Sequence, residues 1–253
     1  MLNQDFKEAY NQFYINNDNE WRLMSAKAKA AHIFEVCKNL KPKKVLEVGA
    51  GDGSILHFLN EAHFGEELYA VEIAESGVDQ IRNRNLERLV DVQQFDGYTL
   101  PFPDKSFDLI VLSHVLEHVE HERILLRELK RVANYIVIEV PKDYRYGVDH
   151  RMAHFLNYGH INMYTPTLLR FLLKSESLEV VKDMTSLTDP KTVEYNIYVN
   201  LKQSKSLFKT AKIHLEYWVK KVFGEILGKK KQEQYANAYT VLVKSSDHEV
   251  SIF

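Results

Sequence analysis

Three glycines alternate along the chain directly after a short apolar run, in the segment VLEVGAGDG at residues 45–53. Because glycine has no side chain, such a loop lets a ligand approach the main chain closely, and the first N–H groups of a following helix can bind its polar atoms. The spacing is G-x-G-x-G, unlike the G-x-G-x-x-G of dinucleotide-binding loops, and no Gly-Lys-Ser/Thr follows as in a P-loop. The loop therefore predicts a ligand held against the backbone, with a tight turn that serves geometry alone as the alternative.

Two carboxylates follow the glycine loop at positions where a nucleoside could use them. Glu72 ends the next predicted strand, roughly 20 residues after the loop, where an acidic side chain can accept hydrogen bonds from both hydroxyls of a ribose. Asp96 precedes Gly97 after the third strand, where a carboxylate could accept from the amino group of an adenine. Each acid alone is more often a solvated loop residue, but together with the glycines they predict a nucleoside-containing ligand.

Histidine, tyrosine and arginine residues gather further along the chain, in segments 113–121 and 142–165. Arginine suits bidentate binding of phosphate or carboxylate, and histidine is a common general base. We therefore predict that these residues bind a small substrate that is anionic or rich in hydroxyl groups. His114 and His150 are the leading candidates for a catalytic base. The predicted substrate-binding residues are Tyr144, Arg145, Arg151, His154, Tyr158 and His160. The alternative is an insertion whose polar side chains simply face water.

The elements that must position these residues alternate between strands and helices. Apolar runs predict the strands, and helical spacing of apolar residues predicts the helices. Strands are predicted at residues 44–48, 67–73, 90–96, 106–114 and 135–141, and helices at residues 54–61, 74–87 and 121–133. This alternation with short connections indicates an α/β fold with a parallel sheet covered by helices on both faces.

Further elements are predicted on either side of this core. Helices are expected at residues 3–16 and 20–40, and Pro42 ends the second. After the long connection, Thr165 is a natural N-cap for a helix whose first turn contains Pro166. The final strands are predicted at residues 178–187 and 235–245.

Composition excludes several classes of protein. Hydrophobic residues make up 45% of the 253 residues and the net charge is -2, so the chain is long enough to bury a core and its overall charge favours neither nucleic acid nor an acidic surface. Cys37 is the only cysteine, which excludes an intramolecular disulfide and a cysteine-rich metal site. We expect no signal peptide at the start and no membrane helix, because no basic flank precedes an apolar stretch and no apolar run approaches the length a membrane helix needs. A cytoplasmic enzyme is predicted.

The stretch from residue 44 to residue 140 resembles the class I S-adenosylmethionine-dependent methyltransferases, specifically their small-molecule, methyltransferase-11-like subgroup. VLEVGAGDG is similar to the first motif of that family, LDVGCGTG, with Glu47 at the usual aspartate and with Ala50 and Asp52 in place of the common Cys and Thr. The segment FDGYTLPFPDKSFDLIVLSHVLEHV at residues 95–119 resembles the family's D-x-x-x-L-P-F-x-D-x-S-F-D-x-V region nearly position by position.

The resemblance implies a Rossmann-like, doubly wound sheet of seven strands, mostly parallel with an antiparallel last strand. It implies S-adenosylmethionine as cofactor and S-adenosylhomocysteine as product. Glu47 and the glycines would surround the methionine moiety, Glu72 would bind the ribose, and Asp96 with Gly97 would lie by the adenine. The implied cofactor-binding residues are Glu47, Gly49, Ala50, Gly51, Glu72, Ile73, Asp96, Gly97 and Ser113. A partly desolvated sulfonium gives a physical reason for carboxylates nearby.

A metal ion is a less favoured addition to this site. If the chain is helical there, His114, Glu117 and His118 share one face by their i, i+3, i+4 spacing, and His150, His154 or His160 could complete a divalent-metal site. The motif partly resembles the Glu-x-x-Glu-His of metal-using small-RNA 3′-end 2′-O-methyltransferases, with His114 at the first Glu. Because LEHV is also common in metal-free members of the family, we predict no resident metal.

A lysine-rich helix is predicted at residues 202–231. Its lysines outnumber its two acids, Glu216 and Glu225, while apolar residues keep helical spacing. We favour a cover helix packed on the sheet or on a subunit, with the lysines facing water. The alternatives are an amphipathic helix on anionic lipid and a helix that contacts RNA.

These observations predict one methyltransferase domain over residues 1–253. It would comprise an N-terminal helical cap (1–42), a cofactor-binding core (43–141), an acceptor-side insertion (142–165) and the basic helix insertion (202–231). The predicted reaction is O-methylation of a small hydroxylated or anionic acceptor, such as a surface-glycan or phosphoramidate precursor of capsule modification. The alternatives are a metal-dependent RNA-terminal 2′-O-methyltransferase and a subunit that binds the cofactor without turnover.

Overall fold

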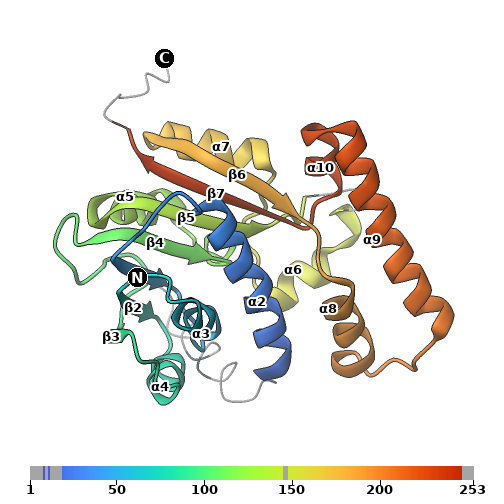
Figure 1. Cartoon of the computed structure of the whole chain (residues 1–253), viewed down its shortest axis with the longest axis horizontal. Coiled ribbons are helices and arrows are strands. Elements are labelled where there is room, and N and C mark those ends of the chain that lie inside the picture. Colours follow the sequence, from blue (N-terminus) through green and yellow to red (C-terminus); the bar gives the residue numbers. More distant parts are fainter. Residues whose placement is uncertain (1–7, 9–10, 12–18, 145–147, 247–253) are drawn as a thin grey trace.

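Seven strands form one sheet in the order β3-β2-β1-β4-β5-β7-β6 in the computed structural model, which describes residues 8, 11, 19–144 and 148–246 (Figure 1). The strands are β1 Lys44–Val48, β2 Glu67–Glu72, β3 Leu89–Gln94, β4 Phe107–Ser113, β5 Ala133–Pro141, β6 Leu178–Ser186 and β7 Ala238–Ser245. β7 is antiparallel to both of its neighbours, and the pairings among β1 to β5 are parallel. The predicted Rossmann-like sheet with an antiparallel last strand is confirmed.

The central strands are apolar because both of their faces are covered. In β1 only Lys44 is exposed, and in β4 only Asp108 is not fully buried. The strand order reverses beside β1, which lies between β2 and β4. Ligands of such sheets bind at this reversal, beyond the carboxyl ends of the strands.

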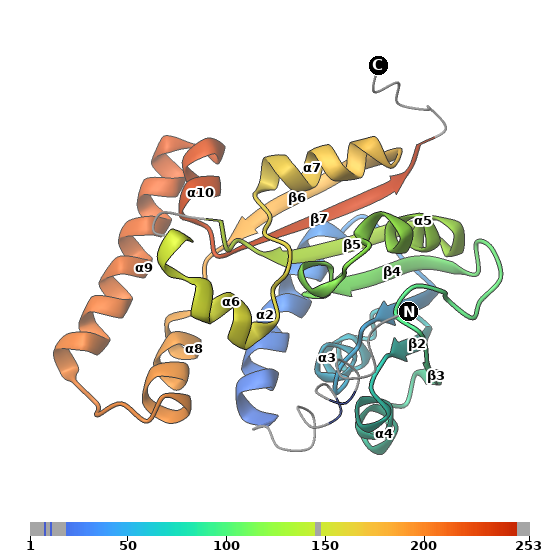
Figure 2. The same cartoon turned by 180° about the vertical axis from the view of Figure 1, so that it is seen from behind.

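Helices cover the two faces of the sheet, as Figures 1 and 2 show from opposite sides. One face packs against α2 Asn19–Val36, α3 Ser54–Glu61 and α4 Glu75–Asn83, and the other against α5 Glu122–Val132 and α7 Pro166–Ser175. Each face has its own buried apolar cluster, with Ile33 and Leu56 in the first and Leu125 and Leu173 in the second. The predicted N-cap of α7 is present, since Thr165 Oγ1 accepts a hydrogen bond from the N–H of Leu168 at 3.2 Å.

The first helices differ from the prediction. The helix expected at 3–16 lies outside the described residues, apart from Glu8 and Asn11. The second helix, α2, ends at Val36 instead of residue 40, because the N–H of Leu40 bonds the carbonyl of Cys37 at 2.7 Å in a turn that replaces the last helical turn.

The late insertions are helical. The connection after β5 contains the short 3₁₀ turn η2 Val148–His150 and α6 Met152–Tyr158. Between β6 and β7 lie α8 Pro190–Tyr195, the π-helical turn η3 Asn196–Asn200, α9 Leu207–Leu227 and α10 Lys229–Tyr235. None of the helices in the described part of the chain combines the length and the apolar character that a membrane span requires.

The basic helix does not cover the sheet as we favoured. α9 lies at the edge of the molecule and packs mainly on α10 and α8 (Figure 1). The interpretation is therefore wrong where it places this helix on the sheet. Packing on a subunit, on lipid or on RNA stays a prediction.

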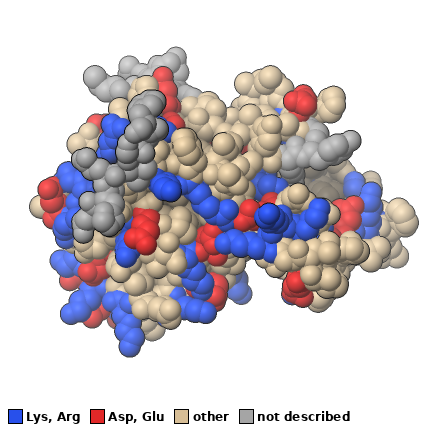
Figure 3. Space-filling model, turned by 90° about the horizontal axis from the view of Figure 1, so that it is seen from above, with Lys and Arg blue, Asp and Glu red and all other residues tan. Residues whose placement is uncertain are grey.

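Charges of both signs share the surface. Figure 3 shows Lys and Arg side chains lying among Asp and Glu side chains on one face of the molecule. Such a mixture differs from the broad basic surface that binds nucleic acid through its phosphates. It agrees with the net charge of -2.

Candidate active site

The glycine loop joins β1 to α3 and leaves its main chain bare. Gly49, Gly51 and Gly53 have φ values of 69°, 59° and 74°, a region that residues with a Cβ adopt only at a cost. A Cβ at Gly49 would lie 2.6 Å from Cγ2 of Val115, in the loop after β4. The N–H of Gly49 donates to the carbonyl of Val71 in β2 at 2.9 Å. The loop is therefore held against two neighbouring strand ends, which fits a ligand pressed against its backbone.

Glu72 lies at the end of β2 and faces the glycine loop. Its buried carboxylate accepts hydrogen bonds from the N–H of Gly51 at 2.8 Å and from the N–H of Ala74 at 3.1 Å. Burial raises the pKa of Glu72, and the backbone hydrogen bonds only partly oppose that. An acid in this position can accept from ribose hydroxyls, so the geometry fits the implied role, which stays a prediction.

Asp96 is exposed after β3, and its Oδ1 already accepts hydrogen bonds from the N–H groups of Tyr98 at 2.8 Å and Thr99 at 2.6 Å. Its carboxylate thus shapes the turn in which Gly97 has a φ of 94°. Any contact with an adenine would be additional to this structural role.

The other residues implied at the cofactor lie at the same edge of the sheet. Ala50 is buried in the loop, and Ile73 is half-buried directly after Glu72. Ser113 ends β4 and is buried, and its Oγ has no hydrogen-bond partner in the described part of the chain. A buried hydroxyl without a partner is costly unless a ligand supplies one.

Glu47 is a buried acid beneath the loop. Burial, together with the charge of Asp52, holds its pKa well above the usual range, and its Oε2 has no hydrogen-bond partner among the described residues. The charge of Lys29 in α2 opposes this shift. Burial lowers the pKa of Lys29, although the carboxylates of Glu139, Glu117 and Glu47 attract its charge. A sulfonium bound beside Glu47 would favour the ionised carboxylate.

His114 forms the centre of an acid–imidazole network. Its Nδ1 lies 3.3 Å from Glu117 Oε1 and its Nε2 lies 3.3 Å from Glu139 Oε1. Glu139 also binds His32 Nδ1 at 2.8 Å and the hydroxyl of Thr240 at 2.6 Å. Burial tends to raise the pKa of Glu139, but the two imidazoles outweigh it and lower that pKa.

The network changes what His114 can do. Burial and the charge of Lys29 tend to lower the pKa of His114, but the carboxylates of Glu117 and Glu139 beside its imidazole outweigh them, so the pKa is raised. The two carboxylates therefore stabilise the protonated form of the imidazole. Its catalytic role stays a prediction.

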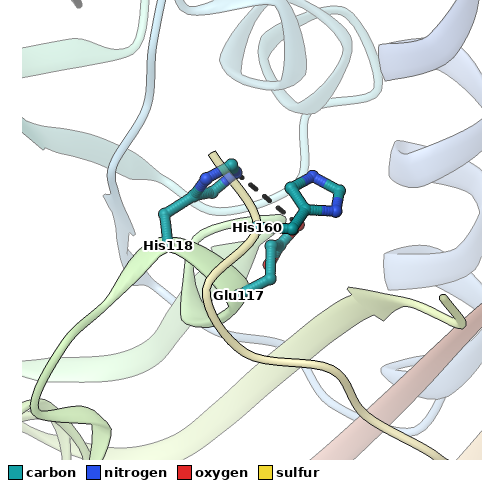
Figure 4. A group of neighbouring side chains, drawn as sticks. All are labelled: Glu117, His118 and His160. Atoms are coloured by element: carbon teal, nitrogen blue, oxygen red, sulfur yellow. Dashed lines mark ion pairs between the residues drawn. The ribbon is translucent and has the colours of Figure 1, made fainter. Parts of the chain in front are cut away.

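The loop after β4 is not the helix that the i, i+3, i+4 argument required. His114 is left-handed, with φ of 56°, and only the 3₁₀ turn η1 Leu116–His118 follows. The two imidazoles nevertheless converge on Glu117, because His118 Nε2 lies 3.9 Å from the same Oε1 that His114 contacts. His160 joins Glu117 and His118 from the segment after α6 (Figure 4). Burial lowers the pKa of His118.

The structure brings only some of the predicted acceptor residues together. His160 and Arg151 both contact Asp143, His160 through Nδ1 at 2.5 Å and Arg151 through Nη1 at 3.3 Å. Tyr158 is exposed with its ring centroid 5.8 Å from that of His160, and Tyr144 is exposed as well. Arg145 and the side chain of His154 lie outside what is described.

His150, our second candidate base, is exposed at the end of η2, and the hydrogen bonds and ion pairs around His114 do not include it. The structure therefore does not unite the two predicted bases in one network. The physical reason is that η2 and α6 carry the insertion outward before the chain returns at His160.

Several functional candidates escaped the sequence reasoning. Lys29 and His32 come from α2, Glu139 from β5, and Asp143 from the residues after it. A charged residue within an otherwise apolar strand indicates a functional candidate, and YIVIEVP has such a residue in Glu139, which is buried in β5. Nothing in the local sequence indicates that α2 packs beside this edge of the sheet.

We predict that Glu72→Ala weakens binding of S-adenosylhomocysteine by about 1–3 kcal/mol, because groups that bonded the carboxylate lose their partner. Calorimetry measures the dissociation constant, and circular dichroism checks the fold. Glu75→Ala, an exposed acid in the first turn of α4, is the matched control and should bind normally. An unchanged affinity in folded Glu72→Ala would refute the ribose assignment.

Comparisons with known proteins agree with this geometry. Residues 46–134 match the model of a methyltransferase domain. A ubiquinone/menaquinone biosynthesis C-methyltransferase from Xanthomonas oryzae is 33% identical over 140 residues, which are 52% of this chain and 54% of that relative. A malonyl-acyl-carrier-protein O-methyltransferase from Halorhodospira halophila is 36% identical over 93 residues, which are 36% of this chain and 31% of that one.

The fold extends the likeness beyond the matched segment. A crystal structure of a SAM-dependent methyltransferase from Thermotoga maritima has a TM-score of 0.60 at 15% identity and covers 94% of this chain and 99% of its own. The similarity to the Xanthomonas protein reaches only about half of that relative's length. Over the matched segment the predicted methyltransferase domain, with S-adenosylmethionine as its cofactor, is confirmed.

Proposed function

We propose that the whole chain is a methyltransferase that transfers the methyl group of S-adenosylmethionine to an oxygen atom of a small hydroxylated or anionic acceptor. The observation that carries the proposal is the network of His114 with Glu117 and Glu139, which follows directly on Ser113 at the end of β4. Acids and imidazoles at this edge can orient a hydroxyl and take up its proton.

The reaction needs alignment more than activation of the donor. The acceptor oxygen attacks the methyl carbon in line with sulfur, so a C–O bond forms as the S–C bond breaks. The products are the O-methylated acceptor, S-adenosylhomocysteine and, for a hydroxyl acceptor, one proton. An anionic oxygen needs no base, whereas a hydroxyl gives its proton to a nearby group or to water.

Surface-glycan or phosphoramidate precursors are the acceptor class we favour. Arg151 is one of the predicted substrate-binding residues, and its guanidinium contacts Asp143. An anionic acceptor would compete with Asp143 for this guanidinium or bind it together with Asp143. The mixed charge of the face in Figure 3 gives no support to an RNA acceptor. A chain that binds the cofactor without turnover is the remaining alternative.

The test supplies ¹³C-methyl S-adenosylmethionine to the protein with nucleotide-linked glycan precursors and cell extract, and NMR identifies the atom that receives the methyl group. We expect an O-methyl signal. We also expect His114→Gln to lower kcat at least about tenfold with little change in cofactor affinity. His121→Gln, an exposed neighbour, is the control.

A carbon- or nitrogen-bound methyl group would contradict O-methylation while leaving methyl transfer intact. Cofactor binding without any labelled product would favour the non-catalytic alternative. Labelled RNA 3′ ends would favour the nucleic-acid alternative.

We further propose that α9 lies against an anionic lipid surface. Its apolar side chains are exposed, with Phe208 at 81%, Leu215 at 64% and Trp218 at 55% exposure, and they form one stripe along the helix. Lys212 and Lys220 belong to the same helix. An exposed apolar stripe accompanied by lysines is the pattern of helices that rest on membranes with anionic headgroups.

Sedimentation with phosphatidylglycerol vesicles tests this proposal. We expect binding that weakens with salt, is absent with phosphatidylcholine, and is lost in Leu215→Ser/Trp218→Ser. Val90→Ser removes an equally exposed apolar residue from β3 and should bind normally. Absence of vesicle binding would refute the proposal, and a dimer in light scattering that Leu215→Ser dissolves would assign the stripe to a second copy of the chain.

A further inference from the structure

We propose that Glu117, His118 and His160 bind one divalent transition-metal ion. One ligand atom from each of the three lies within 4.8 Å of the others. Atoms that share an ion at about 2.0–2.2 Å must lie within about 4.4 Å of each other, so small side-chain movements suffice for coordination. Figure 4 shows the imidazole of His118 and the carboxylate of Glu117 facing each other beside His160.

The carboxylate of Glu117 is a second observation that points to a ligand at this place. Its residue is only 1% exposed, and neither carboxylate oxygen has a hydrogen-bond partner in the described part of the chain. The imidazoles of His114 and His118 lie 3.3 Å and 3.9 Å from its Oε1 as ion-pair partners, while both oxygens keep the capacity to bind a metal ion. A buried carboxylate is costly unless hydrogen bonds, an opposite charge or a metal compensates it.

Both imidazoles are oriented as metal ligands usually are. The Nδ1 of His118 lies 3.0 Å from the carbonyl of Gly159, and the Nδ1 of His160 lies 2.5 Å from Asp143 Oδ2. A hydrogen bond from Nδ1 to a carbonyl or carboxylate fixes the tautomer that presents the lone pair of Nε2, the arrangement common around metal-bound histidine. Asp143 and Gly159 thus act as positioning groups.

The backbone holds the ligands together across the sequence. The N–H groups of Ile161 and Asn162 both donate to the carbonyl of Glu117, at 2.9 Å and 3.0 Å. The side-chain amide of Asn162 donates to the carbonyl of Val119 at 2.7 Å. These bonds clamp the segment that carries His160 onto η1, so the site does not depend on flexible surface side chains.

Two imidazoles and one carboxylate suit Zn²⁺, Fe²⁺ or Co²⁺ better than Mg²⁺ or Ca²⁺, which prefer oxygen ligands. Three protein ligands leave coordination positions open. If the proposed O-methylation is correct, an acceptor hydroxyl in an open position would lose its proton more readily. Metal binding itself does not depend on that reaction.

The experiment titrates chelator-treated protein with Co²⁺, whose visible absorption reports nitrogen and oxygen coordination, and with Zn²⁺ in calorimetry. We expect one ion per chain. Glu117→Gln and His160→Asn, which keep the shape of the side chains, should weaken binding at least about a hundredfold, and Asp143→Asn about 10- to 100-fold. His121→Asn, an exposed histidine close in sequence, should bind like the wild type.

Absence of stoichiometric binding to the wild type would overturn the proposal, as would unchanged affinity in folded Glu117→Gln and His160→Asn. Circular dichroism identifies the folded variants. Methyl transfer that persists in chelator would remove the catalytic role of the ion, whereas ion binding without methyl transfer would leave the site and refute only the proposed reaction.

Discussion

The close approach of the Gly49 main chain to the Val115 side chain sets the geometry of this edge of the sheet. β1 and β4 are neighbours, with Val45 opposite Leu109 and Glu47 opposite Val111, so the loops that leave them must pass each other. A side chain at Gly49 would occupy the place of Val115. The bare loop therefore serves two purposes, since it exposes backbone to a ligand and lets the loop after β4 turn inward with His114.

The buried carboxylates at this edge are compensated in different ways. Glu72 accepts hydrogen bonds from two backbone N–H groups, and Glu139 has two imidazoles and a hydroxyl. Glu47 and Glu117 each retain carboxylate oxygen without a hydrogen bond in the described part of the chain. These two acids lie where we place the two positive groups, the sulfonium beside Glu47 and the metal ion beside Glu117. Buried carboxylate oxygens that lack a hydrogen bond are thus a guide to the ligands that we propose.

The sequence was sufficient for the sheet and the glycine loop, because both depend on local patterns. Strand alternation predicted the core elements within a few residues, and α3 begins and ends where the spacing placed it. The same reasoning failed where distant segments decide the outcome. Nothing local shows that His32 of α2 reaches Glu139 or that His160 returns to Glu117. The helical spacing of α9 predicted its apolar stripe but not that the stripe would be exposed.

A double-mutant cycle on the contact between Gly49 and Val115, with S-adenosylhomocysteine affinity as the readout, tests most directly whether this contact shapes the cofactor site. We predict that Gly49→Ala weakens binding at least about tenfold, because its Cβ would meet Val115, and that adding Val115→Ala restores part of the loss while the strain of the positive φ remains. Wild-type affinity in folded Gly49→Ala would contradict the account, since the cofactor cradle would then not depend on this contact.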